Sequence, residues 1–139
     1  MRFNLAKIIK VFFHRLRHGG FSETELQLYD RIGQAVEAWV RDRGHFRPLP
    51  SIEAMAADIG VQPDQLTVYI RLRTGKAPLS WRKDLRIEEA KRLLAEHPAL
   101  PVSAVAELVG IGDKSNFKRQ FTQATQMSPS AWRARHARK

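Results

Sequence analysis

From residue 47 onward the chain repeats itself, and this repeat limits the possible folds more than any other feature. The stretch 52–60 (IEAMAADIG) matches the stretch 102–110 (VSAVAELVG) at an offset of 50 residues, and 78–82 (PLSWR) matches 129–133 (PSAWR) at an offset of 51. Each copy combines a small residue in mid-helix with a closing glycine, which favours a short helix, a tight turn and a second helix. Two copies are too few for a solenoid, so we expect a duplicated small unit.

The predicted fold is therefore all-α, with two helix-turn-helix units joined by a linker helix and preceded by one or two N-terminal helices. Ser51 and Asp113 are suitable N-caps, and Gly60 and Gly110 suit the two turns. The expected parts are a first helix-turn-helix unit at about 51–75, a linker helix at about 78–95 and a second unit at about 102–125.

Residues 21–46 are predicted to form a support helix. Ser22 and Glu25 have the spacing of a capping box, and Gly44 is placed to end the helix in a left-handed conformation. Apolar residues recur every three to four positions and predict a core face made of Leu28, Ile32, Val36, Trp39 and Val40.

Residues 1–20 are predicted to form a basic amphipathic segment. Lys7 and Lys10 interrupt its apolar residues, which excludes both a membrane-spanning helix and a signal peptide. Two interpretations stay open at this point. The segment packs on the rest of the protein or on a second chain, or its residues 3–17 lie on an anionic membrane surface.

The chain of 139 residues has a net charge of +10, and this charge is unevenly placed. Residues 1–21 carry five bases and no acid, and residues 101–139 carry seven bases and two acids. A phosphate polymer or an anionic membrane is the partner class that such a balance favours. The chain has no Cys, and its five His are scattered, so we expect no metal site, no cofactor and no enzymatic activity.

Three stretches resemble the DNA-binding domain of AraC/XylS-type transcription regulators. They are 85–94 (LRIEEAKRLL), 109–121 (VGIGDKSNFKRQF) and 128–133 (SPSAWR). The resemblance covers about residues 47–135, and we assign 47–139 to this domain. It implies a cytoplasmic, sequence-specific regulator of transcription that binds double-stranded DNA and places two recognition helices in successive major grooves. RNA polymerase is a candidate second partner.

The resemblance also indicates which residues contact DNA, because the family places the second helix of each unit in the groove. Asn can read adenine, and Lys or Arg can read guanine. The implied base contacts are Lys114, Ser115, Asn116, Lys118 and Arg119 in the second unit, and Asp64, Gln65, Thr67 and Val68 in the first. The expected phosphate contacts are Arg47, Ser51, Arg71, Arg82 and Arg133.

Some positions depart from the expected pattern. Gln126 stands where the family commonly has glycine, as Gly75 does in the first unit. Asp64 and Val68 are unusual for a groove-facing helix, which motivates an alternative: a helix-turn-helix interaction module that no longer reads sequence.

The residues before 47 are too few for a ligand barrel, so we expect no small-molecule effector domain. A stand-alone binder, a fragment of a longer chain and a membrane-anchored domain stay open.

Overall fold

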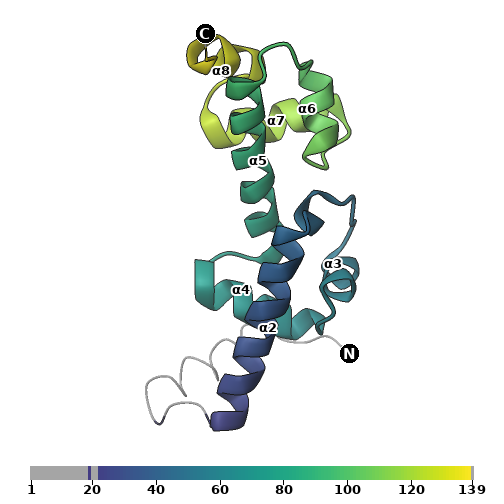
Figure 1. The fold of residues 1–139 in the computed structure, drawn as a ribbon, viewed down its shortest axis with the longest axis vertical. Coiled ribbons are helices and arrows are strands. Elements are labelled where there is room, and N and C mark those ends of the chain that lie inside the picture. Colours follow the sequence, from purple (N-terminus) through teal and green to yellow (C-terminus); the bar gives the residue numbers. More distant parts are fainter. Residues whose placement is uncertain (1–18, 20–21, 139) are drawn as a thin grey trace. The chain divides into compact units, whose positions relative to one another are not determined.

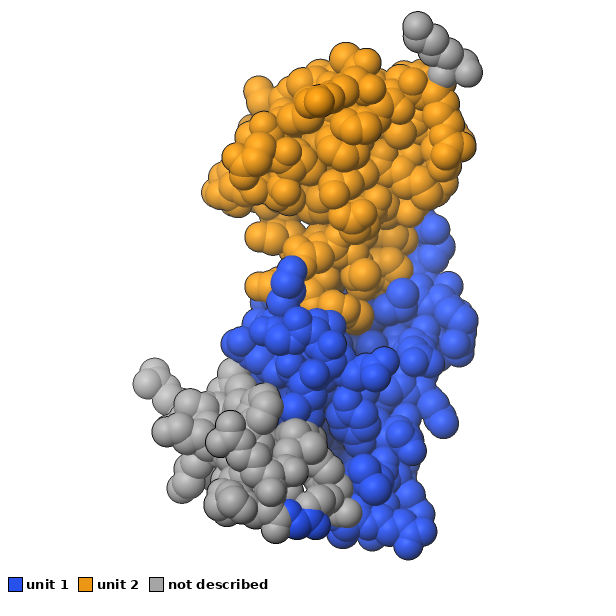
Figure 2. Space-filling model, turned by 90° about the vertical axis from the view of Figure 1, so that its left-hand side faces the viewer, with its two compact units in different colours: residues 1–44, 49–79 blue, residues 45–48, 80–139 orange. Residues whose placement is uncertain are grey.

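The computed structural model of the chain describes residue 19 and residues 22–138. The described residues form α-helices and one short 3-10 helix and include no strand, which confirms the predicted all-α class. The chain divides into two compact units, residues 1–44 with 49–79 and residues 45–48 with 80–139 (Figure 2). The helix predicted for residues 3–17 lies outside the described residues, so that prediction is untested.

Unit 1 contains the helices α2 (Glu23–Arg41), α3 (Ile52–Ile59) and α4 (Pro63–Thr74), shown in Figure 1. Helix α2 packs against both α3 and α4, so the predicted support helix shares a core with the first helix-turn-helix unit. The indole Nε1 of Trp39 donates a hydrogen bond of 2.7 Å to the Asp58 carboxylate and ties α2 to α3. The buried apolar side chains of this unit are Ile32, Val36, Trp39, Met55, Ala56, Leu66, Tyr69 and Ile70.

The start of α2 agrees with the sequence. The backbone N–H of Glu25 donates to the Ser22 hydroxyl at 3.2 Å, and the backbone N–H of Ser22 donates to the Glu25 carboxylate at 3.0 Å. This confirms the capping box. The predicted core position of Leu28 is wrong, because 37% of this side chain is exposed. The buried residues of α2 all fall between Ile32 and Trp39, and before them the half-buried Tyr29 packs its ring against Tyr69 of α4 with centroids 4.9 Å apart.

The end of α2 differs from the prediction. Arg43, not Gly44, has the positive φ of 62°, and Gly44 instead opens the 3-10 helix η1 (Gly44–Phe46). Gly44 is needed for another reason: a Cβ at this position would overlap the indole ring of Trp39. The glycine therefore allows the close approach of a buried aromatic ring and does not stop the helix.

Unit 2 contains α5 (Pro78–Glu96) from residue 80 onward, α6 (Val102–Leu108), α7 (Lys114–Thr125) and α8 (Pro129–His136). These are the linker helix, the second helix-turn-helix pair and a closing helix (Figure 1). One apolar cluster joins α5, α6 and α7, with Trp132 of α8 and Phe46 packed at its edge. The buried members of the cluster are Ile87, Ala90, Leu93, Leu94, Val105, Ala106, Val109, Ile111, Phe117 and Phe121.

A buried arginine holds the segment 45–48 within unit 2. Arg86 is 8% exposed, and its guanidinium donates to the carbonyl oxygens of His45 at 2.7 Å and Arg47 at 2.6 Å. Burial, and to a lesser extent the nearby charge of Arg82, lower the pKa of Arg86 to about 10. The side chain thus stays charged at neutral pH, and charged donors make strong hydrogen bonds to buried carbonyls. A Cβ at Gly110 would overlap the Phe46 carbonyl, so this turn also needs glycine.

The helix ends repeat between the units with one difference. Gly75 closes α4 with φ 74°, and Gln126 closes α7 with φ 64°. Both residues therefore adopt the left-handed conformation that glycine accepts without cost and other residues accept with strain. The expectation that Gln126 occupies a glycine-type position is confirmed.

We predict that Gln126→Gly raises the free energy of unfolding by about 0.5–1 kcal/mol, because it removes the strain of a side chain at positive φ. The matched change Gly75→Gln should lower it by a similar amount, since a Cβ at Gly75 meets open space and introduces only strain. Urea denaturation followed by circular dichroism measures both. Equal stability of the two variants and the parent would contradict this explanation.

Candidate nucleic-acid interface

Helix α7 is held in place by its two phenylalanines. Phe117 and Phe121 are both fully buried, with ring centroids 5.8 Å apart, and Phe121 meets Trp132 edge-on at 6.0 Å. Asp113 caps the helix start, since its carboxylate accepts from the backbone N–H of Asn116 at 2.9 Å. Burial of positions four apart fixes the rotation of the helix, so the opposite face must point to solvent.

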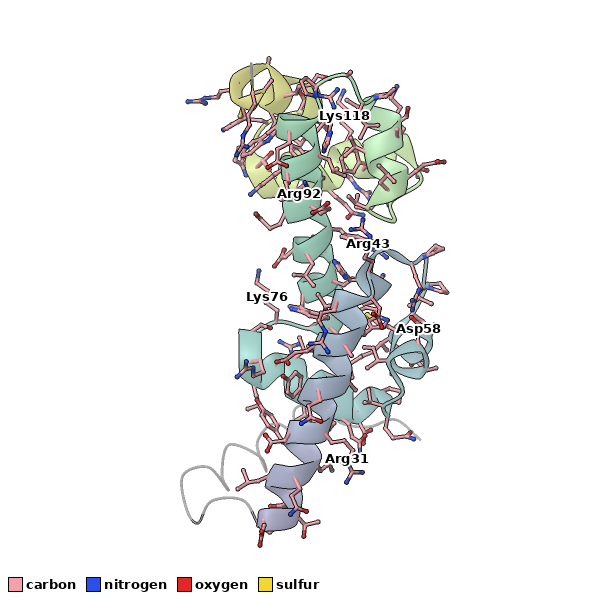
Figure 3. The ribbon with its side chains drawn as sticks, viewed as in Figure 1. Arg31, Arg43, Asp58, Lys76, Arg92 and Lys118 are labelled. Carbon is pink, nitrogen blue, oxygen red and sulfur yellow. The ribbon has the colours of Figure 1, made fainter. Side chains whose placement is uncertain are left out.

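The exposed face of α7 is polar and cationic. Lys114, Ser115, Lys118 and Arg119 are exposed and Asn116 is half-buried, as the family resemblance implied for a groove-facing helix. Lys118 is labelled in Figure 3. A shallow open hollow of about 650 Å³ runs along this face, lined by Ser115, Lys118, Arg119, Thr122, Gln123 and Gln126.

Thr122, Gln123 and Gln126 line this hollow but were not predicted as DNA contacts. Thr122 and Gln123 lie four residues beyond Lys118 and Arg119, which puts them on the same helix face. That helical spacing was the available signal. The face that α7 presents is therefore one turn longer than the sequence analysis assumed.

Three side chains on this face are joined by hydrogen bonds. The side-chain oxygen Oδ1 of Asn116 accepts from Nη2 of Arg119 at 2.5 Å and from Nε2 of Gln120 at 3.2 Å. The two partners are three and four residues along the helix, which is the spacing at which helical side chains meet. Arg119 is therefore held against a neighbour and does not extend freely into solvent.

The corresponding face of α4 is less open. Asp64, Gln65, Val68 and Arg71 are all half-buried. The carboxylate of Asp64 accepts from the backbone N–H of Gln65 at 2.9 Å, so it serves the first turn of the helix. The side-chain oxygen of Gln65 in turn accepts from the backbone N–H of Gln62 at 3.2 Å. The polar groups at this helix start are thus used within the protein.

Thr67 was expected to point outward on α4, and this is wrong. The side chain is 6% exposed, and its hydroxyl donates to the Pro63 carbonyl at 2.9 Å. A threonine can turn its hydroxyl back onto the preceding helical turn, so burial there leaves no donor unsatisfied. Arg71, the cation on this face, has a buried Nε for which the described residues offer no hydrogen-bond acceptor.

The five arginine and serine positions expected at phosphates fall into different surroundings. Arg47 is exposed. The Ser51 hydroxyl caps α3 by accepting from the backbone N–H of Ala54 at 3.1 Å. Arg82 is 9% exposed, and burial lowers its pKa, so the side chain is not extended to solvent as expected. Arg71 is half-buried.

Arg133, the fifth position, acts as a clamp within unit 2. Its guanidinium donates to the carbonyl oxygens of Leu94 at 3.2 Å, His97 at 3.4 Å and Leu100 at 2.5 Å. Leu94 lies in the last turn of α5, whose carbonyls have no partner within the helix, and His97 and Leu100 lie in the segment that follows. The Arg133 guanidinium is therefore hydrogen-bonded within unit 2.

Among the described residues, no group of three or more His, Asp or Glu is placed to hold a metal ion. Nor does the described part of the chain include a helix that is both long and apolar enough to cross a bilayer. The face of α7 and the more closed face of α4 hold the expected base contacts, apart from the buried Thr67.

Known helix-turn-helix proteins are similar to this chain in sequence and in fold. The profile of a family described as a helix-turn-helix domain matches residues 55–135, more than half of the chain. The arabinose operon regulatory proteins of Escherichia coli (strain K12) and Salmonella typhimurium are each 37% identical to it over 83 residues. The chain belongs to the AraC/XylS family of helix-turn-helix proteins.

This AraC/XylS-family chain matches less than a third of the length of the two arabinose regulators. The aligned region is 60% of this chain but 28–29% of the two arabinose regulators. The C-terminal domain of AraT, a response regulator from Geobacillus stearothermophilus, has a similar structure with a TM-score of 0.65 and 25% identity over 81% of this chain and 88% of that chain. The C-terminal domain of the response regulator yesN from Fusobacterium nucleatum shares the fold, with a TM-score of 0.59 and 19% identity over 81% of this chain and 99% of its own.

We predict that Arg133→Ala lowers the free energy of unfolding by about 2 kcal/mol, because it removes a charged donor from the carbonyls that end α5. Arg135→Ala is the matched control: this arginine is exposed on the same helix, and its removal should change stability by less than about 0.5 kcal/mol. Chemical denaturation measures both. An equal loss in the two variants would show that Arg133 is not a clamp.

Proposed function

We propose that this AraC/XylS-type domain binds double-stranded DNA in a sequence-specific manner and regulates transcription. The observation that carries the proposal is the polar, cationic face of α7, held outward by two buried phenylalanines. A helix with short polar and basic side chains on one face fits the major groove, where base edges are distinguishable. Lys114, Ser115, Lys118 and Arg119 are the proposed contacts, with Asn116 beside them.

The charge of the C-terminal region supports the proposal. Residues 101–139 carry seven bases and two acids, and the bases on α7 are exposed. Most protein–DNA hydrogen bonds go to the phosphate backbone, so cations flanking a reading helix supply affinity without sequence preference. Arg47 and Arg71 are the remaining proposed phosphate contacts outside α7, because Arg82 is buried, Arg133 bonds to carbonyls at the end of α5 and the Ser51 hydroxyl caps α3.

We propose that α4 contributes less than α7 to sequence reading. The duplication of the unit supports a second recognition helix in a neighbouring major groove, with Gln65 and Val68 on its groove side. Its side chains are half-buried and Asp64 brings a negative charge, which opposes close approach to phosphates. The same features favour the second candidate function, an interaction module that keeps the fold without reading DNA.

We also propose two further kinds of partner for this chain. A transcription regulator acts on RNA polymerase, directly or by occupying its site, so the polymerase is a second proposed partner and the cytoplasm the proposed location. The basic, amphipathic sequence of residues 1–20 supports an anionic membrane surface or a second protein chain as its partner. The proposed activity is binding and not catalysis.

A salt titration tests the proposal. We expect the affinity for a short labelled duplex of random sequence, measured by fluorescence anisotropy, to fall steeply as salt rises, because each phosphate contact releases counterions. Lys118→Ala should make the log–log slope shallower by about 1. Lys91→Ala is the matched control, because its ammonium lies 2.7 Å from the Glu88 carboxylate on α5. A flat salt response of the parent chain would exclude DNA binding and favour the interaction module.

A further inference from the structure

Asn116 is hydrogen-bonded through both its side chain and its backbone to neighbouring groups of α7 and its cap. Its Oδ1 accepts from Arg119 at 2.5 Å and from Gln120 at 3.2 Å, while its backbone N–H donates to Asp113 at 2.9 Å. An amide oxygen has two lone pairs, and here two donors occupy them. These contacts orient the side chain in the absence of a ligand.

This arrangement conflicts with adenine reading. A bidentate contact with adenine requires the amide oxygen to accept from N6 while the amide nitrogen donates to N7. In Asn116 that oxygen is already used, and turning it toward a base would break the contacts with Arg119 and Gln120. The same rotation would release the Arg119 guanidinium from Asn116, so the two hydrogen bonds gained with adenine would replace two that the protein already makes.

The arrangement suits guanine reading by Arg119. A guanidinium has five N–H donors, and the contact with Asn116 uses one of them. The others remain for the O6 and N7 acceptors of guanine, the commonest specific base contact in the major groove. Because arginine loses much rotamer freedom on binding, holding one end in place reduces the entropic cost of the contact.

We infer that Asn116 is a positioning residue that holds Arg119 to read a guanine, so that α7 selects guanine at this position and Asn116 reads no adenine. The inference rests on the proposed function and makes it more specific. It specifies guanine as the base that this face recognises. Arg119 contacts the base, and Asn116 positions Arg119.

Selection of bound duplexes from a random pool tests the inference. The parent chain should enrich a site that contains a guanine, and Arg119→Ala should remove the preference at that position. Asn116→Ala should weaken the preference for the same guanine, about tenfold in relative affinity, and leave the neighbouring positions unchanged. Gln120→Ala is the matched control, because it removes the other donor to Asn116 and leaves the Arg119 contact in place.

The variant Asn116→Asp separates positioning from direct reading. A carboxylate accepts from Arg119 more strongly than an amide but cannot donate to adenine N7. We therefore expect Asn116→Asp to keep the guanine preference, even if its added charge weakens binding to all sequences. Circular dichroism melting confirms that each variant folds, as the Asp113 cap binds the backbone of residue 116 and survives these changes.

Two sets of results would overturn the inference. If Asn116→Ala and Asn116→Asp both lose an adenine while the guanine preference persists, Asn116 reads adenine directly. If Arg119→Ala leaves the enriched site unchanged, Arg119 reads no base. A parent chain that enriches a defined site with no guanine preference dependent on Arg119 contradicts the inference alone, whereas a parent chain that enriches no sequence, or binds no duplex, contradicts the proposed function as well.

Discussion

The burial of Phe117 and Phe121 is the constraint on which the candidate interface depends. Both rings are fully buried beneath α7, and their spacing of four residues fixes the rotation of the helix about its axis. Everything on the opposite face follows from that rotation, including the exposure of Lys118 and Arg119. A helix that could roll by one residue would bury a cation and expose a ring. The apolar core of unit 2 therefore determines which side chains reach a ligand, although no core atom touches one.

The two helix-turn-helix units share a pattern but differ in what their second helices offer. In α7 the outer face is basic and exposed. In α4 the equivalent face is half-buried, Thr67 is turned back onto Pro63, and Asp64 serves the helix start. A duplicated fold has thus kept its turns, with left-handed residues closing both second helices, while its exposed chemistry has diverged. This difference explains why we assign sequence reading mainly to α7.

Local features of the fold could be predicted from the sequence, and long-range polar contacts could not. The caps at Ser22, Ser51 and Asp113 depend on residues three positions apart, so their patterns are visible in the sequence. Arg86 and Arg133 bond to carbonyls that lie 33 to 41 residues away, and nothing in the neighbouring sequence marks these side chains as donors within the protein. The sequence therefore did not show that Arg133 bonds within the protein or that Arg82 is buried, and both were predicted as phosphate contacts. Gly44 was likewise assigned to a helix stop because its contact with Trp39 depends on how the chain turns after α2.

The central claim is that the outer face of α7 binds DNA. Amide NMR spectra of the isotope-labelled chain, recorded while duplex DNA is added, test this claim most directly because they report every backbone position at once. We predict that the largest shift changes fall on residues 114–126, with smaller ones on α4. Changes confined to the exposed first half of α2, or a spectrum that duplex DNA leaves unchanged, would contradict the account.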